Sequence, residues 1–222
     1  ASGSRCLVGA IRRWTWSFGD GNGGEGPTVM HTYTEPGRYT VTLTLETDQG
    51  AGATLRQTVQ VDQAWVEAVR AGGGLWIEAE NLAGEGGGKS RIVSGRIQAS
   101  DKALTYWEQD LGHWLEWRVV VPTAGTYAIA LRYASGSTQA HREAAIDGAS
   151  PGQAWTAVAF PGTGGYSNQN DNWAWRLLKD RDGAALRCRL EAGDHTLRLT
   201  NRGGGMALDA ILVVPEALLH EP

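Results

Sequence analysis

The sequence contains few of the residues that mark several common protein classes. Only two cysteines occur in 222 residues, so at most one disulfide can form, between Cys6 and Cys188. A small fold held together by many disulfides is therefore excluded. Cys188 lies in ALRCRLEAG, where it alternates with Leu186 and Leu190. Because free cysteine behaves as a small apolar side chain, we expect a buried free thiol at this position.

Long apolar runs and clusters of positive charge are also missing. No run of 18 or more apolar residues occurs, so the sequence predicts no membrane insertion. The net charge is −4 and the 17 arginines and 3 lysines are scattered, which argues against nucleic-acid binding. The chain opens with neither Met nor a signal-peptide pattern. We therefore expect a monomeric fragment of a longer, multidomain protein whose targeting signal lies outside it.

Glycine and tryptophan are abundant instead, with 31 and 10 copies. Glycine suits tight turns, and the indole rings exceed what an ordinary core requires. Apolar and polar residues alternate in RYTVTLTLET (38–47), HWLEWRVVVP (113–122) and TYAIALRY (126–133). Alternation with a period of two is typical of half-buried antiparallel strands. The sequence therefore predicts an all-β protein.

A first pair of motifs lies near the N-terminus. The segments WTWSFGDG (14–21) and HTYTEPGRYTVTLTL (31–45) resemble the two signature segments of the polycystic-kidney-disease (PKD) domain. The resemblance implies an immunoglobulin-like β-sandwich over residues 1–62. The first residues resemble the segment that follows the initial strands of that family, so we expect one or two strands to be missing. An incomplete sheet leaves an unpaired edge, and we expect this domain to be the less stable part of the chain.

A second set of motifs follows a change in pattern. Residues 63–74 lose the alternation and end in three glycines, which predicts a linker. Beyond it, IEAEN (77–81), DLGHWLEWRVVVPTAGTYAIALRYA (110–134) and AGDHTLRLTNRGGGMALDAILV (192–213) together resemble carbohydrate-binding modules of families six and thirty-five. This resemblance covers residues 75–215 and implies a jelly-roll β-sandwich. Residues 216–222 are then a C-terminal tail in which EALLH can form one helical turn.

Two acidic residues stand close together in IEAEN. Glu78 and Glu80 are two apart, and on a strand this spacing places both on one face. Protons, arginines or a cation must offset their repulsion, unless both are simply solvated. In the families named above, two such glutamates and an aspartate of the last strand hold a structural calcium. The resemblance thus implies calcium at Glu78, Glu80 and Asp209, with backbone carbonyls near residues 100–102 completing the oxygen shell.

Two segments have the composition of a sugar-binding surface, in which aromatic rings meet C–H faces and polar groups meet hydroxyls. They are LTYWEQ (104–109) and FPGTGGYSNQNDNWAW (160–175). In the resembling families a cleft clamps a sugar between one aromatic from each region. The resemblance therefore implies a site made from Tyr106 or Trp107 together with Tyr166 or Trp173.

Polar residues complete this predicted site. Asn172 lies in the second segment, whose amide-rich run at 168–172 is also a candidate second metal loop. The families often place an asparagine two residues before the calcium aspartate, and this chain has Ala207 there. Asn201 or Arg202, in the preceding turn, could take over its role.

The sequence shows no pattern of catalytic residues. H-E-x-x-H and G-x-S-x-G are absent, and the five histidines fall in unrelated segments. We therefore predict a non-catalytic, calcium-stabilised region that binds polysaccharide or oligosaccharide. Its expected context is a secreted polysaccharide-degrading enzyme, with a glycoside hydrolase or polysaccharide lyase attached. The alternatives are a cell-surface adhesion or protein-docking module with structural calcium, and a lyase or hydrolase acting within the fragment.

Overall fold

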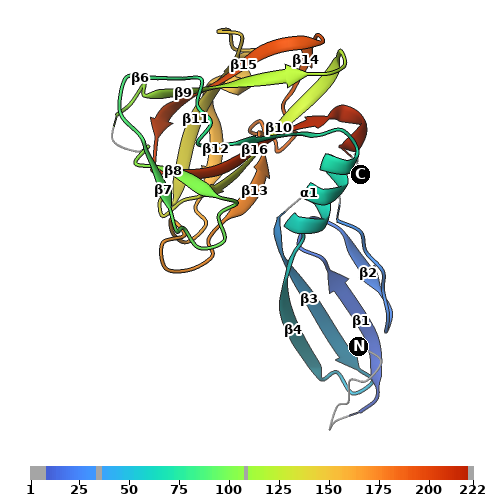
Figure 1. Cartoon of the computed structure of the whole chain (residues 1–222). Helices are drawn as coiled ribbons and strands as arrows, with labels where there is room; N and C mark the ends of the chain where they lie inside the picture. The colour runs from blue at the N-terminus through green and yellow to red at the C-terminus, as the bar shows by residue number, and fades with distance from the viewer. Residues whose placement is uncertain (1–8, 34–36, 108–109, 220–222) are drawn as a thin grey trace. The chain divides into compact units, whose positions relative to one another are not determined.

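The computed structural model describes residues 9–33, 37–107 and 110–219. They fall into two compact units, one within residues 1–65 and one within 66–220 (Figure 1). Nearly all regular structure is β-strand, as the sequence predicts, and the strands pair in antiparallel sheets. None of the helices in the described part of the chain is long and apolar enough to span a membrane.

The first unit is built on one four-stranded sheet. Its strands are β1 (Ile11–Ser17), β2 (Gly23–Glu25), β3 (Arg38–Thr47) and β4 (Gly52–Gln60), in the order β2-β1-β3-β4. The predicted alternation of β3 is confirmed, because Leu43 and Leu45 are buried. The two signature segments meet directly: the ring of Phe18 stacks on His31 at 4.0 Å, and His31 Nε2 lies 2.6 Å from Asp20 Oδ2.

Helix α1 (Asp62–Ala71) occupies most of the segment predicted to be a linker. Its buried residues Trp65, Val66 and Val69 lie on one face of the helix, which is the spacing of an amphipathic helix. Asp62 in the first turn and Arg70 in the last turn complement the helix dipole. The segment is therefore a helix followed by a glycine turn.

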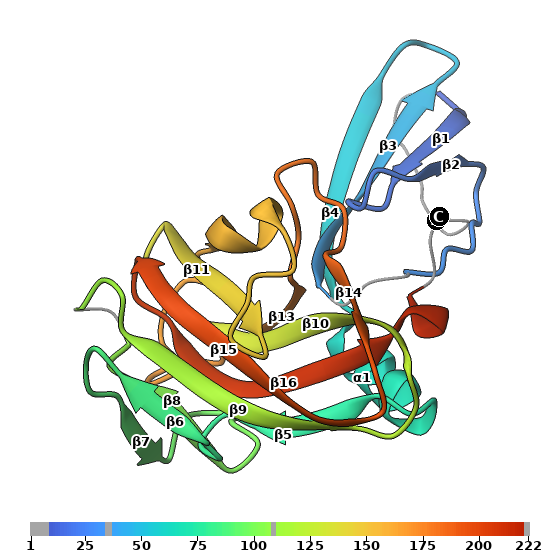
Figure 2. The ribbon, with the colours of Figure 1, turned by 90° about the horizontal axis from the view of Figure 1, so that it is seen from above.

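The second unit is a sandwich of two antiparallel sheets (Figure 2). One has the order β13-β10-β16-β8-β7, with β14 also pairing with β10 and β5 pairing with β16; the other has the order β12-β11-β15-β9-β6. The strands are β5 (Leu75–Glu78), β6 (Gly84–Gly86), β7 (Arg91–Ser94), β8 (Lys102–Thr105), β9 (Trp114–Val121), β10 (Gly125–Ala134), β11 (Gln139–Ile146), β12 (Val158–Pro161), β13 (Ala174–Leu177), β14 (Arg187–Leu190), β15 (Gly193–Gly203) and β16 (Ala207–Pro215). Two short 3₁₀ turns, η1 (Gln153–Ala157) and η2 (Glu216–Leu218), complete the unit, and η2 lies in the predicted tail.

The core lies between these two sheets. On β9 the alternate residues Leu115, Trp117, Val119 and Val121 are buried, as predicted. By contrast, β16 is buried along almost its whole length, so that both of its faces are covered. Cys188 is a free, buried cysteine, and burial raises the pKa of its thiol to about 11. Cys6 lies outside the described residues.

Candidate functional site

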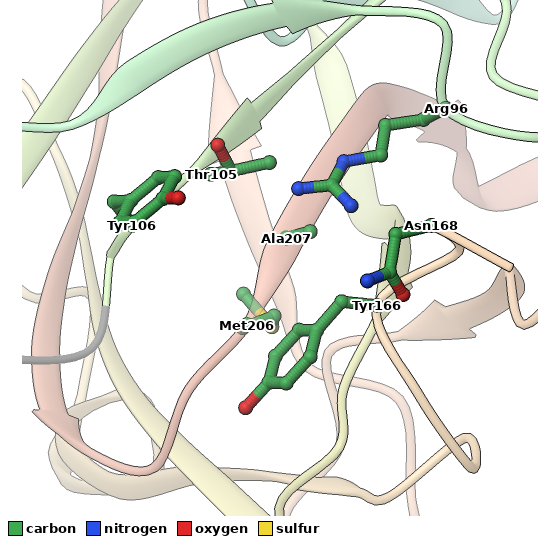
Figure 3. Close-up of a pocket in the computed structure, with 7 residues that line it drawn as sticks. All are labelled: Arg96, Thr105, Tyr106, Tyr166, Asn168, Met206 and Ala207. Atoms are coloured by element: carbon green, nitrogen blue, oxygen red, sulfur yellow. The ribbon is translucent and has the colours of Figure 1, made fainter.

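A pocket of about 180 Å³ lies on the second unit. Its lining residues are Arg96, Thr105, Tyr106, Tyr166, Asn168, Met206 and Ala207 (Figure 3). They come from the end of β8, the start of β16 and two loops, at 95–101 and 162–173. The two segments that the sequence selected for sugar binding therefore meet at one place, although about 60 residues separate their tyrosines.

Tyr106 forms one wall of the pocket. It directly follows β8 with φ of +60°, a left-handed conformation that L-residues seldom adopt. Its side chain is 45% exposed, and the guanidinium carbon of Arg91 lies 4.5 Å from its ring centroid. The aromatic ring is thus presented to solvent beside a cation.

Tyr166 is half-buried on the other side, so that the two tyrosines flank Met206 in Figure 3. Its ring packs over Gly136, where a Cβ atom would come within 2.6 Å of Tyr166 Cε2. The next residue, Ser167, has φ of +55° and accepts a hydrogen bond from Asn172 N on its Oγ atom at 2.9 Å. A glycine below the ring and a fixed turn beside it therefore hold Tyr166 in place.

Arg96 and Asn168 line a further side of the pocket. Their two loops are joined at Ile97, whose N–H donates to Ser167 O at 2.9 Å. The carbonyl of Ile97 in turn accepts from Trp173 Nε1 at 2.8 Å. Among the described residues that line the pocket, only Arg96 is charged. The sequence did not predict Arg96 as a site residue, because the candidate segments were chosen by their aromatic residues and the loop at 95–101 contains none.

The two predicted tryptophans lie in the core and not in the pocket. Trp107 is completely buried and donates from Nε1 to His113 O at 3.1 Å. Trp173 is 3% exposed. Neither ring can stack on a ligand from these positions. Of the alternatives that the sequence offered, Tyr106 and Tyr166 are the residues that line the pocket.

The predicted polar residues Asn172, Asn201 and Arg202 do not line the pocket. Asn172 holds the turn after Tyr166, as described above. Asn201 is completely buried. Arg202 is exposed and pairs with Glu143, its Nε lying 3.0 Å from Glu143 Oε2. Ala207, the position at which the resembling families often have asparagine, is part of the pocket lining.

Glu78 and Asp209, two of the three predicted calcium ligands, are brought together by β5 and β16. The Oγ atom of Ser100 donates to Glu78 Oε2 at 2.7 Å, and Ser100 N donates to Asp209 Oδ1 at 2.8 Å. Asp209 is fully buried, and Arg132 Nη1 donates to its Oδ2 atom at 2.6 Å. The sequence did not predict this ion pair.

Glu80 differs from the other two carboxylates. Its Oε2 atom is buried and has no hydrogen-bond partner within the described ranges. Burial raises the pKa of Glu80, and the nearby charges of Glu78 and Asp101 raise it further. No group of three or more His, Cys, Asp or Glu side chains in the described part of the chain is arranged to hold a metal on its own. A cation at this place would therefore need backbone or hydroxyl oxygens as further ligands.

Comparison with known proteins agrees with both resemblances. Residues 1–62 match the family model of the PKD domain. A family 35 carbohydrate-binding module from Clostridium thermocellum is 19% identical, over 63% of this chain and 96% of that chain, with a TM-score of 0.51. A family 35 module from Paenibacillus barcinonensis is 20% identical, over 63% and 98%, with a TM-score of 0.49.

A carbohydrate-binding module of Cellvibrio mixtus lichenase 5A, solved in complex with cellotriose, is 24% identical over 63% of this chain and 95% of that chain, with a TM-score of 0.45. At such identities the likeness concerns the fold. The β-sandwich of carbohydrate-binding modules, which the sequence predicted, is confirmed.

Proposed function

We propose that the second unit is a non-catalytic carbohydrate-binding module and that its pocket is the sugar site. One observation carries the proposal: the two aromatic segments selected from the sequence each deliver a tyrosine to the same pocket. Aromatic rings stack on the C–H faces of sugars, while neighbouring polar groups bind the hydroxyls. Thr105, Arg96 and Asn168 supply those polar groups.

The size of the pocket indicates how much of a glycan it holds. Its volume of about 180 Å³ is below the roughly 300–1,000 Å³ of pockets that enclose drug-sized ligands. The site therefore suits one sugar residue, with the rest of the glycan in solvent. The wider context that we propose is a secreted polysaccharide-degrading enzyme, in which this unit holds the polymer and an attached domain cleaves it.

We also propose that calcium stabilises this unit, because the residues fit a cation. The Oε2 atom of Glu80 is buried, has no hydrogen-bond partner among the described residues and lies near the like charges of Glu78 and Asp101, which a cation would neutralise. Glu78 and Glu80, with the backbone of residues 100–102, would hold the ion. Arg132 occupies Oδ2 of Asp209, so Asp209 would contribute through Oδ1, which also accepts the Ser100 N–H. Bound calcium supplies structural support and no chemistry, by stabilising the folded state in which its ligands meet.

Removal of an aromatic wall is expected to weaken glycan binding strongly. Tyr166→Ala should remove most of the stacking, which is worth about 1 kcal/mol beyond area burial, in addition to about 1.5–3 kcal/mol of buried apolar side chain. The expected result is at least a tenfold loss of affinity. Affinity gels containing neutral or uronic-acid polysaccharides measure it as lost retardation.

Val120→Ala is the matched control, since it truncates an exposed apolar side chain on β9 outside the pocket. Tyr166→Phe separates the ring from its hydroxyl group. If the wild type is retarded and Tyr166→Ala is retarded equally, the pocket is not the site. If no glycan binds the wild type, the proposed function fails and the protein-docking alternative gains support.

Arg96 is expected to favour acidic glycans, because it is a cation and none of the described residues that line the pocket is a carboxylate. Charge-assisted hydrogen bonds contribute about 1.5–3 kcal/mol, so Arg96→Gln should weaken binding to a uronic-acid polymer about tenfold or more. Arg96→Lys should retain part of the preference. Retardation on matched neutral and acidic gels measures the ratio, and an unchanged ratio in Arg96→Gln would contradict the prediction.

A further inference from the structure

Arg142 on β11 is a buried cation surrounded by backbone carbonyls. Its side chain is fully buried among strands and loops, and burial lowers its pKa to about 9, so it still carries its charge at neutral pH. Burial of a guanidinium is unfavourable unless its N–H groups find acceptors. The acceptors of Arg142 therefore identify the chain segments that it connects.

Arg142 binds two chain segments that are far apart in the sequence. Its Nη2 atom donates to Trp107 O at 3.0 Å and to Gly204 O at 3.1 Å. Its Nη1 atom donates to Gly203 O and Gly204 O, both at 3.1 Å. The guanidinium carbon also lies 4.1 Å from the ring centroid of Trp107. One planar group thus fixes the backbone after Tyr106 to a glycine turn.

Asn201 reinforces the same arrangement. Its Oδ1 atom accepts from Arg142 Nη1 at 2.9 Å and from Gly203 N at 3.0 Å. Its Nδ2 atom donates to Asp110 O at 3.0 Å. The sequence selected Asn201 as a sugar ligand, but in the structure its side chain is used to support Arg142 and the turn.

Both segments held by Arg142 continue directly into the pocket. Trp107 follows Tyr106, and the turn at Gly203 and Gly204 leads through Gly205 into Met206 and Ala207. Gly204 has no room for a side chain, because a Cβ atom there would lie 2.4 Å from Gln139 O. The distance between the Tyr106 wall and the Met206 floor is therefore set where the two segments meet Arg142.

We propose that Arg142 is a positioning residue for the sugar pocket: by binding Trp107 O and Gly204 O together, it sets the placement of Tyr106 against Met206 and Ala207. It touches no ligand itself. Lysine cannot replace it, because an ammonium has three donors that diverge from one atom, whereas the two Nη atoms of the flat guanidinium reach both segments at once. The Nε atom is buried and has no partner among the described residues. The expected effect of Arg142 on glycan affinity rests on the proposed function. Its expected effect on the placement of the Tyr106 ring does not.

Fluorine NMR of the chain labelled with 3-fluorotyrosine tests the geometric part without any ligand. The protein has six tyrosines, and single Tyr→Phe variants assign their resonances. In Arg142→Lys the Tyr106 resonance should shift or broaden, while that of Tyr127, which is anchored to Thr123 O, stays unchanged. Arg118→Lys, an exposed arginine on β9, is the control and should change neither.

An unchanged Tyr106 resonance in folded Arg142→Lys would overturn the proposal, as would an equal change at Tyr127, since either shows a purely structural role. If Arg142→Lys does not fold, Asn201→Ser takes its place, because it removes one acceptor of the same cluster. An unchanged Tyr106 resonance, or an equal change at Tyr127, would overturn the proposal in that variant too. Circular dichroism establishes which variants are folded.

A double-mutant cycle tests the functional part, with cellotriose and trigalacturonate as probes in calorimetric titration. Arg142→Lys and Tyr106→Ala should each weaken binding about tenfold, the equivalent of one or two lost hydrogen bonds. If Arg142 acts through Tyr106, the double variant should be no weaker than Tyr106→Ala alone. A fully multiplicative loss, about 100-fold, overturns the proposal. Wild-type protein that binds neither probe counts against the sugar site, while the fluorine result still decides the role of Arg142.

Discussion

Asp209→Ala is expected to lower the free energy of unfolding of the second unit by about 3–5 kcal/mol, the usual effect of removing one partner of a buried ion pair. Asp209 is completely buried, and the Arg132 side chain that it pairs with is 20% exposed. Truncation would leave this guanidinium and Ser100 N–H without their acceptor. Urea unfolding in the presence of a chelator, so that no metal contributes, measures the loss.

Asp194→Ala is the matched control for that experiment. It also removes an aspartate that pairs with an arginine, but the side chains of Arg118 and Asp194 are 65% and 62% exposed. Exposed ion pairs contribute about 0–1 kcal/mol, so the control should unfold almost like the wild type. Equal losses in the two variants would show that the buried carboxylate is not the stabilising group.

Calcium is expected to raise the melting temperature of the second unit by about 5–10 °C. A ligand at 100 times its Kd stabilises the folded state by about 2.7 kcal/mol, and about 1 kcal/mol shifts the melting temperature by roughly 2–4 °C in a domain of this size. Glu80→Gln should remove the response, because the neutral amide neither attracts the ion nor repels Glu78. Differential scanning calorimetry with and without calcium, with magnesium as the control ion, measures it.

The metal-free protein should show a distinct pH dependence. The folded-state pKa of Glu80 is raised above its usual value, so the folded state binds the proton more tightly than the unfolded state. Without calcium, stability should therefore increase as the pH falls through the raised pKa toward about 4.5, and the increase should be missing in Glu80→Gln. A calcium response of Glu80→Gln equal to that of the wild type would contradict the proposed site.

The strands with one solvent-facing side could be predicted from the sequence alone. In β3 and β9 the apolar residues alternate because one face meets the core and the other meets water. β16 is also predicted as a strand, from the apolar segment MALDAILVV, but its burial on both faces could not be read from an alternation of apolar and polar residues. The sequence did not predict α1, because the three glycines at 72–74 favoured a linker. The buried residues Trp65, Val66 and Val69 have the spacing of one helix face and could have indicated it.

The candidate site was predictable only to the level of the segment. Tyr106 and Trp107 are adjacent and face opposite environments, and which of them is exposed depends on a left-handed backbone conformation that the sequence does not display. Arg96 joins the pocket through hydrogen bonds between its loop and the loop after Tyr166. The pairing of Arg132 with Asp209 depends on the register of β10 against β16, which only the folded sheet defines.

The first and last strands of the second unit are antiparallel neighbours, with Leu75 opposite Val213 and Glu78 opposite Ala210. The chain therefore comes into this sandwich and leaves it at the same end of one strand pair. Tension applied through the flanking chain would load the hydrogen bonds between β5 and β16 one after another, as in opening a zipper, and not all together in shear. When both ends of this unit are pulled, the hydrogen bonds between Leu75 and Val213 are therefore the first to be loaded, and the sandwich begins to open there.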